Sequence, residues 1–81
     1  MEFDTDKIDE DVLALLYLTA FKDAKDLPWR TWKSHDWDAM DRLCAKGYIS
    51  DPKGKAKSVV LTEEGYARAK QLFEAKYAKM G

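Results

Sequence analysis

The fold is decided by residues 43–65, which read LCAKGYISDPKGKAKSVVLTEEG. Gly47 is well placed to end a helix in the left-handed conformation that glycine adopts at low cost. A short apolar segment, residues 48–49, follows it. Residues 51–54 (Asp-Pro-Lys-Gly) form a turn signal, because proline presets one backbone angle and glycine relieves another. The first half of this stretch therefore predicts a helix end, a short strand and a tight turn.

The second half of the stretch predicts a strand and a new helix. Residues 59–61 (Val-Val-Leu) are typical of a strand, and we expect them to pair with Ile49 as a β-hairpin. Thr62 is positioned to cap the last helix, with two glutamates in its first turn. Three lysines alternate across the tip of the predicted hairpin: Lys53, Lys55 and Lys57.

Length and composition predict one small domain over residues 1–81, with residues 1–5 loosely ordered. The chain has 81 residues, of which 46% are hydrophobic and 12% aromatic, enough for one packed core. Its single cysteine, Cys44, excludes an internal disulfide and a cysteine-rich zinc site. No apolar run approaches the ~20 residues needed to cross a bilayer, and the acidic start does not resemble a signal peptide. We therefore expect a cytoplasmic protein.

The remaining segments predict one long helix and one short one. A helix over about residues 6–21, capped by Thr5 or Asp6, carries apolar side chains at helical spacing. Its expected buried stripe consists of Ile8, Val12, Leu15, Leu16 and Thr19. Residues 22–33 are harder to assign. Pro28 can start a helical turn, so we expect a brief or 3₁₀-like helix there.

A further helix is predicted over residues 36–46. Ser34 or Asp36 can cap this helix, and Asp38 lies in its first turn. Its expected apolar stripe places four side chains toward the core: Trp37, Met40, Leu43 and Cys44. The predicted fold class is α+β and mostly helical. It is winged helix-turn-helix-like, with three to four helices and a two-stranded β-hairpin as the wing.

Residues 40–65 resemble the corresponding part of bacterial multiple-antibiotic-resistance-type winged-helix regulators. The matching residues are Leu43, Gly47, Tyr48, Ile49 and, after the wing, Leu61, Thr62, Glu63, Glu64 and Gly65. The whole chain is also similar to a small, functionally uncharacterised bacterial protein family of about this length (~80 residues in one domain). The regulator motif covers about a third of the chain. Its residues serve mainly as cap, turn and core, so it indicates a fold more than a function.

The resemblance implies nucleic-acid binding. The helix at 36–46 would enter the major groove, and the wing would touch the backbone. Lys53, Lys55 and Lys57 would contact phosphates by charge, and Arg42 and Lys46 would supply contacts from the helix. The same helix carries aspartates that repel phosphate, namely Asp36, Asp38 and Asp41. This makes it a poor reader of bases.

Charge is divided unevenly along the chain, although the formal net charge is only −1. Residues 1–41 carry eleven acidic and five basic side chains, a net of −6. Residues 42–81 carry four acidic and nine basic side chains, a net of +5. Such a chain can present one face that attracts anions and another that repels them, or it can simply have solvated surfaces.

The alternative is a protein-interaction winged helix that docks on a partner through an acidic, tryptophan-rich face. Trp29, Arg30 and Trp32 are its candidate contacts, because tryptophan and arginine are enriched at interface hot spots. The first and last of these fit a core position equally well, whereas Trp37 is expected in the core.

Catalysis is not expected. His35 stands between a serine and an aspartate, but adjacent side chains diverge and cannot form a catalytic triad. One histidine and one cysteine are not a metal-ligand set, so we expect no catalytic residues, no metal and no cofactor. The sequence predicts a binding module and leaves nucleic acid and protein open as partners. A homodimer is compatible with the last helix but not required.

Overall fold

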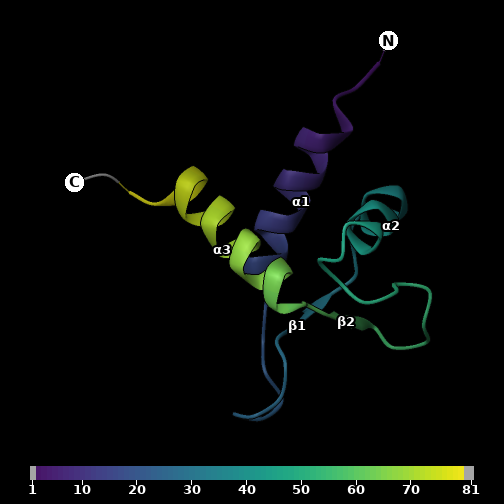
Figure 1. Cartoon of the computed structure of the whole chain (residues 1–81), viewed down its shortest axis with the longest axis vertical. Coiled ribbons are helices and arrows are strands. Elements are labelled where there is room, and N and C mark those ends of the chain that lie inside the picture. The colour runs from purple at the N-terminus through teal and green to yellow at the C-terminus, as the bar shows by residue number, and fades with distance from the viewer. Residues whose placement is uncertain (1, 80–81) are drawn as a thin grey trace.

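The computed structural model describes residues 2–79, and the fold is small and α+β. Its elements, in chain order, are α1 (Thr5–Leu18), β1 (Arg30–Trp32), α2 (Trp37–Ala45), β2 (Ser58–Val60) and α3 (Glu63–Tyr77). Helix α1 packs against both α3 and α2, and the strands lie where these helices meet (Figure 1). The predicted fold class is confirmed, since the three helices and the antiparallel strand pair make a small α+β fold that is consistent with a winged-helix-like arrangement. Met1 and residues 80–81 of the predicted domain lie outside the described residues.

The sheet joins two segments that are far apart in the sequence. Strands β1 and β2 are antiparallel, with Thr31 opposite Val59 and Trp32 opposite Ser58. On the other side of β2, the predicted pairing of the segment after α2 is present as a single bridge from Ile49 to Leu61. β2 is therefore flanked by two segments, one on each side.

The brief helix predicted within residues 22–33 is wrong, because residues 30–32 form β1 instead. The residue before a proline is disfavoured in the helical region, so Pro28 keeps its neighbour extended. The hydroxyl of Thr31 is fully buried and donates a hydrogen bond to the Leu16 carbonyl at 2.8 Å. That bond ties β1 to the end of α1.

Helix α1 begins and ends earlier than predicted. Asp4 caps it, accepting a bond from the Lys7 backbone N–H, and the helix stops at Leu18 rather than near residue 21. The loose start predicted for residues 1–5 is correspondingly shorter. The buried face also differs, because Ile8 and Leu15 are more than a third exposed. The α1 side chains that reach the interior are Asp9, Leu13, Ala14 and Leu16.

The capping residues around α2 and α3 lie where the sequence predicts. Asp36 accepts a bond from the Ala39 N–H, and Thr62 accepts one from the Gly65 N–H at 2.9 Å. Gly47 has a φ of 81°, the left-handed conformation expected after a helix. The Thr62 hydroxyl also donates to the Gly47 carbonyl at 2.7 Å. This single threonine therefore ties the start of α3 to the end of α2.

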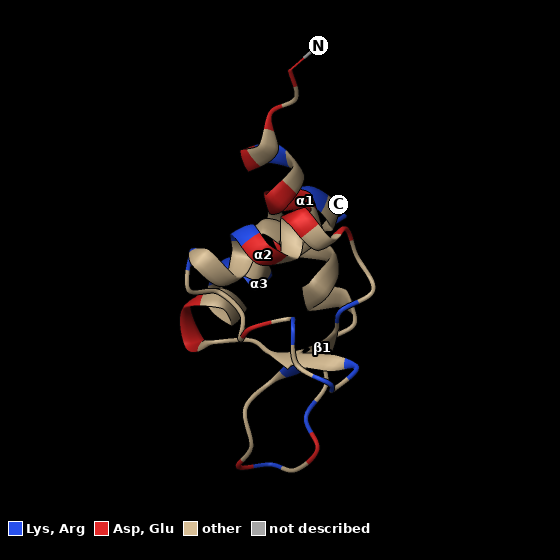
Figure 2. Ribbon diagram, turned by 90° about the vertical axis from the view of Figure 1, so that its right-hand side faces the viewer, with Lys and Arg blue, Asp and Glu red and all other residues tan. Residues whose placement is uncertain are grey.

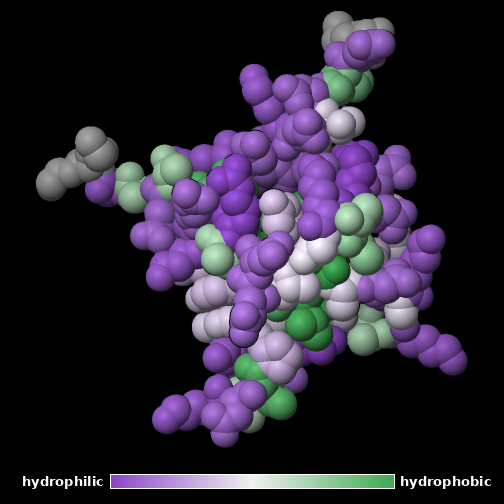
Figure 3. All heavy atoms as spheres, viewed as in Figure 1, coloured by the Kyte–Doolittle hydropathy of each residue, from purple (hydrophilic) through white to green (hydrophobic). Residues whose placement is uncertain are grey.

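The core lies between the helices and the inner face of the sheet. It contains Leu13, Ala14, Leu16, Met40, Leu43, Ile49, Val59, Leu61, Ala69 and Leu72. Hydrophilic side chains cover the outer ends of the helices, and apolar ones show where the helices meet the sheet (Figure 3). Within residues 2–79, no helix is long and apolar enough to span a membrane.

Candidate functional site

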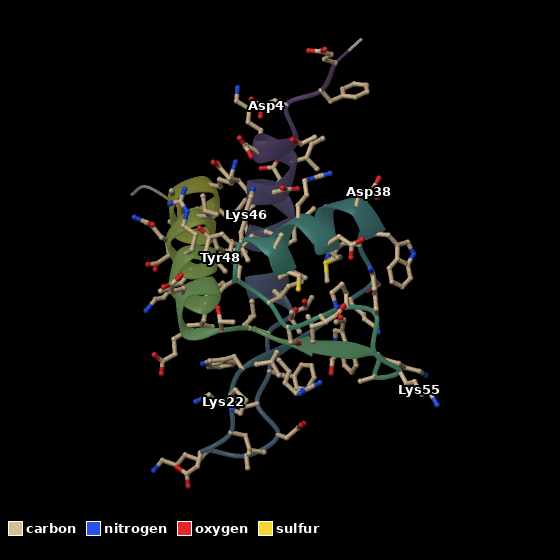
Figure 4. The ribbon with its side chains drawn as sticks, turned by 45° about the vertical axis from the view of Figure 1, so that its right-hand side comes forward. Asp4, Lys22, Asp38, Lys46, Tyr48 and Lys55 are labelled. Atoms are coloured by element: carbon tan, nitrogen blue, oxygen red, sulfur yellow. The ribbon has the colours of Figure 1, made fainter. Side chains whose placement is uncertain are left out.

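Two basic residues predicted to contact nucleic acid are paired with a buried carboxylate. Asp9 on α1 has no exposed surface, and both of its carboxylate oxygens accept hydrogen bonds from the Arg42 Nε–H, at 3.0 and 2.9 Å. The Lys46 ammonium lies 3.1 Å from the same carboxylate. Figure 4 shows Lys46 alongside α1. We call these three residues the Asp9 cluster.

The Asp9 cluster keeps its carboxylate ionised. Burial of Asp9 raises the pKa of its carboxyl, but the hydrogen bonds from Arg42 and Lys46 outweigh it and leave the pKa below its usual value. The same contacts raise the pKa of Lys46, chiefly through its hydrogen bond to Asp9. A buried carboxylate of this kind requires its cations, so they are poorly available to an outside ligand.

Other charges of the two sequence halves also pair with each other. Lys76 on α3 lies 2.7 Å from Asp11, and Arg68 lies 3.9 Å from Glu10. Figure 2 shows acidic and basic segments interleaved on α1 and α2. The net charges of the two halves therefore do not separate into one acidic face and one basic face. Several acidic residues of the first half instead pair with basic residues of the second half, between helices.

The three wing lysines lie in the segment that connects the Ile49 bridge to β2, which we call the lysine loop (residues 50–57). Its tip lysines, Lys53, Lys55 and Lys57, are exposed. Within the described part of the chain, none of them forms a salt bridge. Figure 4 shows Lys55 projecting outward from the loop. These cations, unlike those of the Asp9 cluster, face solvent.

Lys33, just after β1, shapes the lysine loop. Its ammonium donates hydrogen bonds to the carbonyls of Pro52 and Gly54, and its backbone N–H donates to the Lys57 carbonyl at 3.2 Å. Pro52 itself is buried, and Asp51 accepts a bond from the Lys53 N–H at the turn. The loop is therefore held against the sheet by specific contacts.

A surface groove of about 390 Å³ lies beside the lysine loop. We call it the tryptophan groove, and its lining residues are Trp32, Lys33, Ser34, Trp37 and Lys57. Trp32 is 49% exposed and Trp37 is 63% exposed, although tryptophan is usually well covered. One side of the Trp32 ring packs on Phe21, with ring centroids 4.9 Å apart. Two tryptophans and two lysines thus line one groove.

The structure separates the candidate protein-contact residues. Trp29 stacks on Tyr66 with ring centroids 4.8 Å apart and nearly parallel planes, and Lys22 lies over its ring. The Arg30 guanidinium bonds to the hydroxyl and the carbonyl of Ser58, at 2.9 and 3.2 Å. Trp29 and Arg30 therefore have internal partners, whereas Trp32 opens to solvent.

Trp37 corrects the sequence analysis, because it does not lie in the core. It is the first residue of α2, one position after the cap. The large α2 side chains that reach the interior are Met40 and Leu43, which lie further along the helix. Cys44, predicted to be buried, is only partly covered. The helical spacing of Trp37 from the core residues was therefore a misleading signal.

A family model and a curated relative each match nearly the whole chain. The family described as DUF6429, a domain of unknown function, matches residues 4–79. The chain belongs to the DUF6429 family. "Uncharacterized protein y4hR" of Sinorhizobium fredii (strain NBRC 101917 / NGR234) is 46% identical to this DUF6429 chain over 79 residues, covering 98% of the chain and 100% of that relative. No solved structure matches it. The predicted whole-chain similarity to a small bacterial family is thus confirmed.

Among the lining residues of the groove in this DUF6429 domain, Lys33 was not singled out from the sequence, and Trp37 was expected in the core. Lys33 and Lys57 meet only because β1 pairs with β2, a contact across 24 positions of the chain. A usable signal was present, since residues 30–32 combine a β-branched and an aromatic residue shortly after a proline. Reading them as a strand would have brought Trp32 to the wing.

Proposed function

We infer that the protein is a small nucleic-acid-binding module, a regulator of the winged-helix kind, that binds through its lysine loop and does not catalyse a reaction. The observation that carries this inference is the contrast among its cations. Arg42 and Lys46 are engaged by Asp9, whereas Lys53, Lys55 and Lys57 face solvent on a loop held in place by Lys33. Exposed lysines on an anchored loop suit contacts with phosphates.

Helix α2 has no role as a base reader in this proposal. Its exposed surface carries Asp38 and Asp41, and Asp36 caps its first turn. Phosphate would be repelled there, and Arg42 is already committed to a buried carboxylate. The expected binding is therefore driven by charge and independent of base sequence. The proposal places the protein in the cytoplasm, where nucleic acid is available and a thiol such as Cys44 stays reduced.

The test is a titration of a fluorescently labelled 20-nucleotide DNA, single-stranded and duplex, followed by anisotropy at increasing salt. Replacing Lys53, Lys55 and Lys57 by Gln should weaken binding at least tenfold at ~50 mM salt. It should also make the affinity less dependent on salt concentration, by the amount expected for the loss of about two phosphate contacts. The matched control replaces Lys7, Lys25 and Lys70, three exposed lysines elsewhere, by Gln. No binding of either DNA at ~50 mM salt would overturn the proposed function.

A second candidate function is docking on a protein partner, and the exposure of Trp32 and Trp37 favours it. Two indoles open to solvent in one groove have the composition of an interface hot spot. Asp36 and Asp38 beside this groove would complement a basic partner. A pull-down from a native host distinguishes the two functions. Recovery of a stoichiometric partner that survives nuclease treatment and is lost with Trp37→Ala would favour docking.

A further inference from the structure

We propose that the tryptophan groove binds the bases of a single-stranded nucleic acid, with the strand's phosphates on the lysines beside it. This inference rests on the proposed function and names its substrate class. It is carried by the juxtaposition of two exposed indoles, Trp32 and Trp37, with Lys33 and Lys57 in one groove of about 390 Å³.

The two indoles supply a surface for bases, which a site that binds phosphates alone would not require. A nucleobase stacks on an indole face whatever its identity, and such stacking adds substantially to single-strand affinity. In a duplex the bases already stack on each other and are not available. Two exposed indoles in a groove of this size therefore select for unpaired bases over paired ones.

The lysines of the groove are arranged for an anion. The backbone bond from Lys33 to Lys57 makes them cross-strand neighbours at the end of the sheet. Like charges at facing positions of a sheet destabilise it, so this pair costs stability until an anion lies between or beside them. Lys33 donates two of its three ammonium hydrogens to loop carbonyls, which leaves one for a phosphate.

The acidic surface of α2 sets the path of the strand. Asp38 and Asp41 lie on α2, and Figure 4 shows Asp38 and Lys55 at separate places on the same side of the molecule. A phosphate backbone would avoid the aspartates and follow the lysine loop. The bases would then turn inward to the groove. A rigid duplex laid on the loop would bring its second strand toward the acidic helix, which again favours a single strand.

Trp29, the remaining tryptophan of the chain, lies outside the groove and serves as an internal control. Trp29 is stacked on Tyr66 and covered by Lys22, so its faces are already occupied. A base cannot displace Tyr66 without breaking the packing of Trp29 against α3. Binding should therefore perturb two indoles of the three and leave the third unchanged.

The experiment compares two single strands of equal charge at ~50 mM salt: an oligothymidylate of 20 nucleotides and an abasic strand of the same length. Wild type should bind oligothymidylate at least tenfold more tightly than the abasic strand or a duplex. Trp37→Ala should remove most of that preference and leave abasic-strand binding unchanged, while Trp37→Phe retains it. Leu18→Ala, which removes an apolar side chain that is 63% exposed on α1, is the surface control.

Each outcome decides between the two proposals. Equal affinity for the oligothymidylate and the abasic strand, unaffected by Trp37→Ala, would overturn base stacking while leaving phosphate binding by the lysine loop intact. No binding of either single strand, with the duplex still bound, would overturn the single-strand proposal alone. No binding of any of the three DNAs would overturn both proposals. Because Trp37 is exposed at the start of a helix, its variants should fold, and circular dichroism of each variant confirms this before titration.

Discussion

The Asp9 cluster and the tryptophan groove each contain two cationic side chains, yet they differ in what neutralises them. In the Asp9 cluster, Arg42 and Lys46 share a carboxylate that has no exposed surface. In the groove, Lys33 and Lys57 stand together with two indoles and a serine, and no carboxylate is among the lining residues. The comparison teaches that a lysine or arginine is available to a ligand only where the fold has not already supplied its anion.

The largest expected effect tests the close approach of α3 to the segment that follows α2. A Cβ at Gly65 would lie 1.9 Å from the carbonyl oxygen of Tyr48, which is backbone and cannot move aside cheaply. Gly65→Ala should therefore lower the free energy of unfolding by about 4 kcal/mol, through overpacking. Chemical denaturation monitored by circular dichroism measures this loss.

The matched control for Gly65 is Gly54 in the lysine loop. A Cβ there would meet nothing closer than 4.0 Å, so Gly54→Ala should change stability by less than about 0.5 kcal/mol. Equal stability of the two variants would mean that α3 does not approach the Tyr48 backbone as closely as described.

Asp9→Asn tests the Asp9 cluster. The change keeps the size of the side chain and removes the charge that both cations contact. We expect a loss of about 3 kcal/mol, near the lower end for a broken buried pair, because Arg42 and Lys46 are each about a third exposed and can be partly hydrated. The triple lysine-to-glutamine variant of the lysine loop should lose no stability relative to wild type. A comparable loss there would contradict the division between the two regions.

The pH dependence of stability is a second test of the Asp9 cluster. The pKa of Asp9 is lowered in the folded state, so its contribution is present above an unfolded pKa of ~3.9 and is lost as pH falls through the folded value. The pKa of Lys46 is raised, so its contribution is present below ~10.4 and is lost as pH rises further. Wild type minus Asp9→Asn should therefore show a stability difference that is flat between about pH 5 and 9 and shrinks below pH 4. A difference that grows as pH falls below 4 would contradict this account.

The smallest expected effect lies on the groove side. Trp37 is mostly exposed, so Trp37→Ala should change the free energy of unfolding by no more than about 0.5 kcal/mol. Trp29→Ala provides the contrast, since it removes a stacked partner of Tyr66 and should cost about 3 kcal/mol. Thermal unfolding of the two variants gives the comparison. A large loss from Trp37→Ala would show that it serves packing rather than binding.

Local signals predicted the caps and turns of this fold, and contacts between distant residues decided the rest. Gly47, Asp36 and Thr62 each act on backbone groups within a few positions, so their roles follow from residue type and spacing. Nothing local reveals that Asp9 would meet Arg42, 33 positions later. The lysine loop was predicted from its own residues. The groove depends on the pairing of β1 with β2. That pairing was not predicted, because the segment that contains β1 follows a proline, is rich in tryptophan and was not recognised as a strand.

The most direct test of the central claim follows the three indole N–H signals and the Arg42 Nε–H signal by ¹⁵N NMR while oligothymidylate is added. The account predicts that the Trp32 and Trp37 signals shift on binding, whereas those of Trp29 and Arg42 stay in place, because stacking on Tyr66 and the bond to Asp9 already occupy them. A shift of the Arg42 signal, with the Trp32 and Trp37 signals unmoved, would contradict the account and return the binding surface to α2.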